Sequence, residues 1–234
     1  MSDSWDEIAG WWVEEVLNDP AYGDDVHPVL SELLYGTGGT AIDLGCGEGQ
    51  GIRLVGGSVI GTDHAFGLLR HARLNAPVVQ AKLPDLSWVR TDSFSLAYSV
   101  YLLDLIADHQ GFFDETARIV RSGGHLVVVI NHPVYTAPGS APLMDDDGEI
   151  LWRWGSYFTE GSSSEPAGEA TVEFHHRPLN TILSAASRSG WALEQMVERG
   201  LSAQTVARFP EYIGQEQIPR IAGFRWVRQS TGLL

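Results

Sequence analysis

The sequence contains a single cysteine and a single lysine, and both scarcities restrict what the protein can be. Cys46 has no second cysteine with which to form an internal disulfide, which favours a reducing cytoplasm. Lys82 is the only lysine, and the formal net charge is −15. Proteins that bind nucleic acid need a basic surface, and no cluster of lysine or arginine is present. We therefore expect no nucleic-acid partner.

Long apolar runs are also missing. No stretch approaches the roughly 18 apolar residues of a transmembrane helix, so we expect no membrane partner. Residues 1–7 are acidic and lack the basic start of a signal peptide, which again predicts a cytoplasmic location. Hydrophobic residues make up 44% of the chain and charged residues 19%, which predicts a packed core.

The most informative stretch is the glycine-rich segment 41–51. Residues 40–44 predict a short buried strand, four glycines follow at every second position, and residues 52–55 begin a helix. Strand, glycine turn and helix in this order bring backbone close to a nucleotide. Glycine permits positive φ and has no Cβ to hold a ligand away, and free N–H groups at a helix start suit an anion.

The spacing of the glycines separates two classes of ligand. A dinucleotide fingerprint, G-x-G-x-x-G, requires glycine where Gln50 stands. The motif here is instead D-x-G-x-G-x-G, beginning at Asp43, and it resembles motif I of the class I S-adenosylmethionine (SAM) methyltransferases. In that family a second acid ends the next strand and binds the ribose hydroxyls. Asp63 ends the strand predicted over residues 58–62.

Further matches to this family continue to residue 130. Segment 82–88 corresponds to the family's acid-Ala-x-x-Leu-Pro-Phe run, with Lys82 in the position of the acid that reads adenine, and the backbone N–H of Leu83 could still serve. Residues 92–99 resemble the run into strand four, and 121–124 match the R-x-G-G turn before a strand over 125–130. The resemblance implies SAM as cofactor, S-adenosylhomocysteine as product, and these cofactor-binding residues: Asp43, Gly45, Cys46, Gly47, Gly49, Asp63, His64, Lys82, Leu83 and Ser99.

The resemblance also implies a fold, whereas the alternating pattern of strands and helices supports only the α/β class. We expect a Rossmann-like, doubly wound, seven-stranded sheet in the order 3-2-1-4-5-7-6. One methyltransferase domain would span residues 1–234, with final strands over 191–201 and 218–228. Residues 1–36 would form a helical cover, with helices over 5–17 and 25–34, and the irregular segment 133–174 would form a lid inserted after strand five.

Methyl transfer needs alignment of the reactants and exclusion of water, and acceptors of high pKa also need a base. Candidates lie after strands four and five. Tyr101 and Asp104 follow the first, and Asn131 and His132 follow the second. His132 is the leading candidate for a base because imidazole titrates near neutral pH. Alternatively, it only hydrogen-bonds the loop that follows.

Other polar clusters are interpreted as structural. His175 and His176 precede a helix and are expected to make a cap or lid contact. The acidic run 145–149 is expected to be a solvated turn. No group of residues has metal-ligand spacing, so no metal is predicted.

The lid hypothesis depends on aromatic residues. Trp12, Trp152, Trp154 and Tyr157 are predicted to wall the acceptor pocket. The alternatives are that the N-terminal tryptophans only pack on the core and that the insertion is an oligomerisation element.

The sequence therefore predicts a SAM-dependent methyltransferase acting on a small molecule, with O-methylation favoured over N- or C-methylation. We expect a monomer or a homodimer. One alternative is a SAM-binding regulator or partner subunit without activity, and another is an NAD-dependent oxidoreductase.

Overall fold

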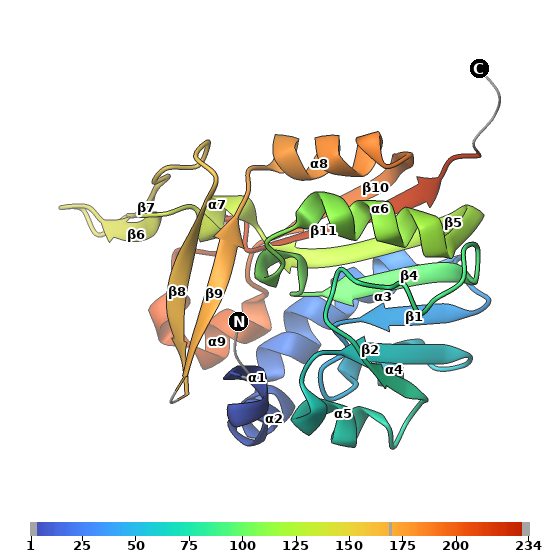
Figure 1. The fold of residues 1–234 in the computed structure, drawn as a ribbon. Helices are drawn as coiled ribbons and strands as arrows, with labels where there is room; N and C mark the ends of the chain where they lie inside the picture. The colour runs from blue at the N-terminus through green and yellow to red at the C-terminus, as the bar shows by residue number, and fades with distance from the viewer. Residues whose placement is uncertain (1–3, 169, 231–234) are drawn as a thin grey trace.

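A twisted sheet of seven strands forms the centre of the molecule (Figure 1). The computed structural model describes residues 4–168 and 170–230. The strands lie in the order β10-β11-β5-β4-β1-β2-β3. Their bounds are β1 Ala41–Leu44, β2 Val59–Asp63, β3 Val78–Gln80, β4 Phe94–Val100, β5 Val120–Asn131, β10 Trp191–Arg199 and β11 Ile221–Arg228.

The pairing confirms the predicted order 3-2-1-4-5-7-6, with β11 as the seventh strand and β10 as the sixth. β1 runs parallel to β2 and β4, and β4 runs parallel to β5. Only β11 reverses, pairing antiparallel with both β5 and β10. The carboxyl ends of β1, β2, β4 and β5 therefore meet along one edge of the sheet.

Strand β5 shows why the centre of the sheet is apolar on both faces. Leu126, Val128 and Ile130 face a core formed with the helices α6 (His109–Ile119) and α8 (Leu179–Arg188). Val127 and Val129 face the opposite core, which includes α3 (His27–Leu34). Because both faces of a central parallel strand are buried, its sequence is a continuous apolar run, as predicted.

The R-S-G-G segment, residues 121–124, interrupts the regular pairing between β4 and β5. Phe94 pairs with Val120, but Leu96 pairs with His125, so residues 121–124 bulge between two points that are only two residues apart on β4. Gly123 has φ +74°, a conformation that glycine adopts readily. The expected turn is therefore present, although it lies inside the span assigned to β5.

The N-terminal cover is helical, but it is divided differently from the prediction. In place of one helix over 5–17 there are α1 (Ser4–Glu7) and α2 (Ala9–Asn18), both of which pack on α5 (Phe66–Ala72). The helix predicted over 25–34 is a π-helical segment, η1 (Tyr22–Val26), followed by α3. The helix after the glycines is α4 (Gln50–Val55), two residues longer than expected at its start.

Segment 133–174 is more regular than its sequence suggests. It begins with α7 (Pro133–Thr136) and continues as two antiparallel hairpins, β6 (Ala141–Met144) with β7 (Ile150–Arg153), and β8 (Gly161–Ala167) with β9 (Ala170–His176). The interpretation of this segment as irregular was wrong. The acidic run is the turn of the first hairpin, where Asp145 Oδ1 accepts from the N–H groups of Asp147 and Glu149, as predicted.

Short elements complete the described chain: η2 (Leu103–Leu105) after β4, and α9 (Ala203–Arg208) and η3 (Pro210–Tyr212) between β10 and β11. Across residues 4–168 and 170–230, no helix combines the length and apolar character needed to cross a membrane. The same residues contain no group of three or more histidine, cysteine or acidic side chains arranged to hold a metal ion.

Candidate functional site

A cavity of about 530 Å³ opens at the carboxyl ends of the parallel strands. Its lining includes the glycine turn after β1, Asp63 at the end of β2, Tyr101 after β4 and Asn131 at the end of β5. This volume lies within the range of small-ligand pockets, and ligands of open α/β sheets bind at this edge. The fold therefore brings residues from four strands into one site.

The glycine turn gives a ligand close access to backbone. Gly45 has φ +70°, and a Cβ there would lie 2.6 Å from the Leu102 side chain. A Cβ on Gly47, which has φ +53°, would meet nothing within 4 Å. The space beside Gly47 is therefore open to the cavity, while Gly45 is required by close packing.

The N–H groups of the turn are largely used within the protein. Those of Gly45 and Cys46 donate to the Thr62 carbonyl at 2.8 and 3.0 Å, and that of Gly49 donates to the Cys46 carbonyl at 2.9 Å. The N–H of Gly47 donates to Asp63 Oδ2 at 2.9 Å. At these four positions the turn therefore supplies shape, and the expectation of free N–H groups at the helix start concerns the residues that follow.

Asp63 connects the turn to the end of β2. Its other oxygen, Oδ1, accepts from the N–H of Ala65 at 2.8 Å. Burial removes water from the Asp63 carboxylate and raises its pKa, and hydrogen bonds from the N–H groups of Ala65 and Gly47 partly offset this. The carboxylate is thus held in one orientation beside the cavity.

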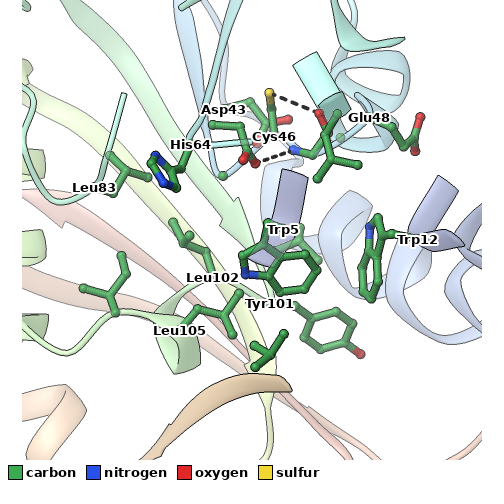
Figure 2. A pocket seen from close by; sticks show the side chains of 18 of the residues that line it. Trp5, Trp12, Asp43, Cys46, Glu48, His64, Leu83, Tyr101, Leu102 and Leu105 are labelled. Atoms are coloured by element: carbon green, nitrogen blue, oxygen red, sulfur yellow. Dashed lines mark hydrogen bonds between the residues drawn. The ribbon is translucent and has the colours of Figure 1, made fainter. Parts of the chain in front are cut away.

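Asp43 lies deeper, at 3% exposure, where a Cβ on Gly51 would be 2.7 Å from its Oδ2. Burial raises the pKa of Asp43 to about 8, and the neighbouring Tyr98 hydroxyl opposes that shift. Figure 2 shows Asp43, Cys46 and Glu48 on the side of the cavity formed by the turn, across from Trp5 and Leu105.

Most of the predicted cofactor-binding residues line this cavity, including His64, Lys82 and Leu83. Gly49 and Ser99 are absent from the lining. Gly49 begins α4 with φ +99°, and a Cβ there would meet Ala72. Ser99 is fully buried inside β4. Both positions support the structure of the site without facing the space.

The three catalytic candidates have different positions. Tyr101 lines the cavity in a left-handed conformation, φ +54°, and burial raises the pKa of its hydroxyl. Asp104 is buried behind Asn131, whose Nδ2 donates to its Oδ2 at 3.4 Å. Burial raises the pKa of Asp104 to about 7, and Asn131 and Arg177 partly offset this. Asn131 therefore stands between Asp104 and the cavity, which it lines itself.

His132 does not line the cavity, and its role as a base stays a prediction. Its ring is 2% exposed; Nδ1 accepts from the N–H of Val134 at 3.1 Å, and Nε2 lies 2.7 Å from Glu198 Oε1. Burial lowers the pKa of this imidazole. The side chain caps α7, which is the alternative role considered from the sequence. Successive residues at a strand end point in different directions, so Asn131 reaches the cavity and His132 does not.

The wall opposite the turn comes from the N-terminal cover and β9. Trp5, Trp12 and Tyr22 line the cavity together with Val172 and Phe174. Val172 and Phe174 share one face of β9, and they pack in a cluster with Ile8 of the N-terminal cover. Residues 133–174 thus supply a wall, but through β9.

The aromatics predicted for that wall from the insertion lie elsewhere. Trp152 stacks on Tyr135 with a centroid distance of 5.4 Å. Trp154 is 60% exposed and packs edge-on against Tyr157. Trp152, Trp154 and Tyr157 are absent from the cavity lining, and Trp12 is the one of the four that lines it.

Sequence reasoning missed Arg177, which is 6% exposed. Its guanidinium donates to the carbonyls of Leu103, Ile106 and Ala107, the loop that contains Asp104 and part of the cavity wall. The preceding His176 bonds Thr136 and the Tyr157 carbonyl, a structural role as expected. The H-R-P-L run was visible in the sequence, but nothing in it indicated which loop the arginine would hold.

Comparison with known proteins agrees with this geometry. Residues 42–128 match the family described as Methyltransferase domain. A solved structure of an S-adenosylmethionine dependent methyltransferase from Mesorhizobium loti is 31% identical, with a TM-score of 0.77 over 86% of this chain and 96% of that chain. The chain belongs to the SAM-dependent methyltransferases.

Curated relatives of this methyltransferase match over a shorter stretch. A trans-aconitate 2-methyltransferase from Azoarcus sp. is 28% identical over 106 residues, covering 43% of this chain and 42% of that protein. Another, from Acidovorax sp., is 33% identical over 95 residues, covering 37% and 36%. The matched region spans about two fifths of these relatives.

The site fits the family's cofactor. The space beside Gly47 is open, the Asp63 carboxylate is fixed at the end of β2, and apolar side chains follow on the far side. Membership of this family removes the NAD-dependent oxidoreductase as an interpretation.

Proposed function

We propose that this methyltransferase transfers the methyl group of SAM to a small-molecule acceptor held in the same cavity. One observation carries the proposal: the glycine turn and Asp63 share a single cavity with the apolar wall of Trp5, Tyr101 and Phe174. The relatives named trans-aconitate 2-methyltransferase support a small acceptor. The free Cys46 and the composition support a cytoplasmic location.

Residues on the glycine-turn side would hold the cofactor. Asp63 would accept hydrogen bonds from the ribose hydroxyls, Gly45, Cys46 and Gly47 would border the methionine part, and Leu83 with His64 would border the adenine. Lys82, beside them, replaces the acid that the family uses there, so adenine recognition rests on backbone and shape. When bound, SAM supplies an electrophilic methyl group on a sulfonium.

The remaining residues would arrange the acceptor and exclude water. Trp5, Leu105 and Phe174 give an apolar surface that keeps water from the reacting atoms. Asn131 and Tyr101 offer polar atoms at the strand ends, where orientation alone can lower the barrier greatly. An acceptor of high pKa needs a base, and His132 lies outside the cavity.

Titration calorimetry with SAM and S-adenosylhomocysteine tests the cofactor half. Asp63→Ala should weaken SAM binding by about 1–3 kcal/mol, because the ribose loses a charged acceptor and Gly47 loses its partner. Asp146→Ala, in the exposed hairpin turn, serves as the matched control and should leave SAM affinity unchanged. Equal SAM affinity in the wild type and Asp63→Ala would mean that the ribose lies elsewhere.

Product formation separates an enzyme from a binding protein. The wild-type chain should release S-adenosylhomocysteine when SAM and a suitable acceptor are supplied. Mass spectrometry of the acceptor should then detect the added methyl group. Tight SAM binding with no methylated product across charged, neutral and aromatic acceptors would favour the non-catalytic regulator or partner subunit.

A further inference from the structure

The charges around the cavity are unevenly distributed. Among the described residues that line it, four are acidic and one is lysine or arginine. The acidic residues are Asp43, Glu48, Asp63 and Glu173, and the basic one is Lys82. Lys82 follows β3 at one edge of the sheet, whereas Glu173 lies on β9, which contacts α1 and η2. Burial keeps Asp43 protonated below about pH 8 and Glu48 is paired with Arg53, so the acid on the β9 side of the cavity is Glu173, an exposed residue.

The apolar part of the wall suits a cation better than an anion. Trp5 and Trp12 meet edge to face with a centroid distance of 5.2 Å, and both line the cavity with Tyr101 and Phe174. The faces of aromatic rings attract ammonium groups and repel carboxylates. Figure 2 shows Trp5, Trp12 and Tyr101 among the side chains that line the cavity.

Asn131 adds a hydrogen-bond acceptor on the strand-end side of the cavity. Its Nδ2 donates to Asp104, and above about pH 7, where Asp104 is ionised and can only accept, the amide cannot be reversed without losing this bond. The Oδ1 atom is therefore the part of Asn131 left for a ligand. An N–H of a ligand can donate to Oδ1, whereas a carboxylate would bring a second acceptor against it.

We infer that the acceptor is an amine with an apolar or aromatic body, seated between the Trp5–Trp12 corner and Asn131, and not a carboxylate. The inference rests on the proposed function and specifies its substrate class. The amine binds as ammonium, and its proton leaves to water before transfer. The nitrogen lone pair then forms the new N–CH3 bond while the S–CH3 bond breaks, its electron pair staying on sulfur. The methylated ammonium product needs no base from the protein.

Three probes of similar shape and different charge test the inference: 2-phenylethylamine, 2-phenylethanol and 3-phenylpropanoate. Calorimetry is performed on the full chain saturated with S-adenosylhomocysteine. The amine should bind about tenfold more tightly than the carboxylate, since an acidic cavity with aromatic faces favours the cation. Equal or tighter binding of the carboxylate or the alcohol overturns the inference, and so does a lack of measurable binding by all three.

A matched pair of variants on one hairpin locates the effect. Glu173→Gln should reduce the preference for the amine about two- to fivefold, which is the effect of one partly exposed charge. Glu165→Gln makes the same change on β8, at an exposed position outside the cavity lining, and should leave the preference unchanged. An equal effect of both variants would mean that net charge, not the cavity, selects the amine, and would overturn the placement.

Failure of this inference can be told apart from failure of the proposed function. If S-adenosylhomocysteine does not bind, the cofactor site itself is misassigned. If S-adenosylhomocysteine binds and 3-phenylpropanoate is preferred, the cofactor site stands and only the acceptor class is wrong.

Discussion

Asp43 is a carboxylic acid at the end of β1 that has lost nearly all contact with water. Burial raises its pKa from an ordinary 3.8 to about 8, so the folded chain keeps a proton that the unfolded chain has released over this pH range. Because the pKa of Asp43 is higher in the folded state than in the unfolded state, the contribution of Asp43 to the free energy of unfolding is highest at low pH. It falls as pH rises from about 4 to about 8 and then levels off.

Asp43→Asn should remove this dependence, because the amide does not titrate. The difference in free energy of unfolding, variant minus wild type, should increase by up to about 1.4 kcal/mol per pH unit between pH 5 and 8. Urea unfolding at several pH values measures the slope, which is independent of any constant cost of the added NH2. Asp146→Asn, in the exposed hairpin turn, is the control. Parallel pH profiles for Asp43→Asn and the wild type would contradict a buried, protonated Asp43.

Most of the predicted cofactor-binding residues line the cavity, whereas fewer of the residues predicted to hold or wall the acceptor do so. The glycines and Asp63 are set by local backbone geometry, which a motif records directly. The contrast between Asn131 and His132 depends on where each side chain points after β5 ends, and no motif records that direction. Gly49 and Ser99 were predicted to bind the cofactor but do not line the cavity, again because a motif does not record which way a residue faces.

At the scale of elements, the second hairpin determines the shape of the acceptor wall. Val172 and Phe174 alternate toward Trp5 and Leu105, while β8 is serine-rich and exposed. A strand of such polar composition gives no apolar alternation, so the sequence did not predict the hairpin. Trp152, Trp154 and Tyr157 were predicted to wall the pocket because they are large and aromatic, but they lie outside the cavity lining.

Phe174→Ala and Trp154→Ala test which part of the insertion forms the wall. Phe174→Ala should weaken binding of 2-phenylethylamine up to about tenfold, because apolar contact area is lost at the cavity. Trp154→Ala should leave that affinity unchanged, since its ring is exposed and outside the lining. Both variants should retain their affinity for S-adenosylhomocysteine. A larger loss with Trp154→Ala would restore the original assignment of the wall.

Arg177 follows β9 and bonds the loop after β4, and both of these elements border the cavity. Arg177→Lys should lower the free energy of unfolding by about 2–4 kcal/mol, because one ammonium cannot replace a planar group that bonds three carbonyls, two of them buried. Hydrogen exchange should also rise over residues 103–107. Arg208→Lys, in an exposed ion pair with Asp24, should cost less than about 1 kcal/mol. Equal losses in the two variants would refute the role of Arg177 as a link.

At the scale of the whole molecule, strand order and charge were both accessible from sequence. The order follows from family membership, and the apolar run of β5 marks the strand that is buried on both faces. Whether the chain is a monomer or a homodimer stays a prediction, as does its description as one domain.

The net charge of −15 predicts that nucleic acid does not bind. Fluorescence anisotropy with a labelled RNA and a labelled DNA duplex should show no saturable change at physiological ionic strength, because phosphates find no basic surface to neutralise. A basic RNA-binding domain tested in parallel confirms that the assay responds. Saturable binding that weakens with added salt would contradict the prediction.

The rarity of lysine and cysteine has a practical consequence for the chemistry of the cavity. Lys82 is the only side-chain amine in the sequence and Cys46 the only thiol, and both border the same space. Lys82 is exposed, whereas Cys46 is buried and burial raises the pKa of its thiol. Amine-directed acylation followed by peptide mass mapping therefore reports on one edge of the cavity without any engineered residue, and the slower alkylation of Cys46 reports on the other.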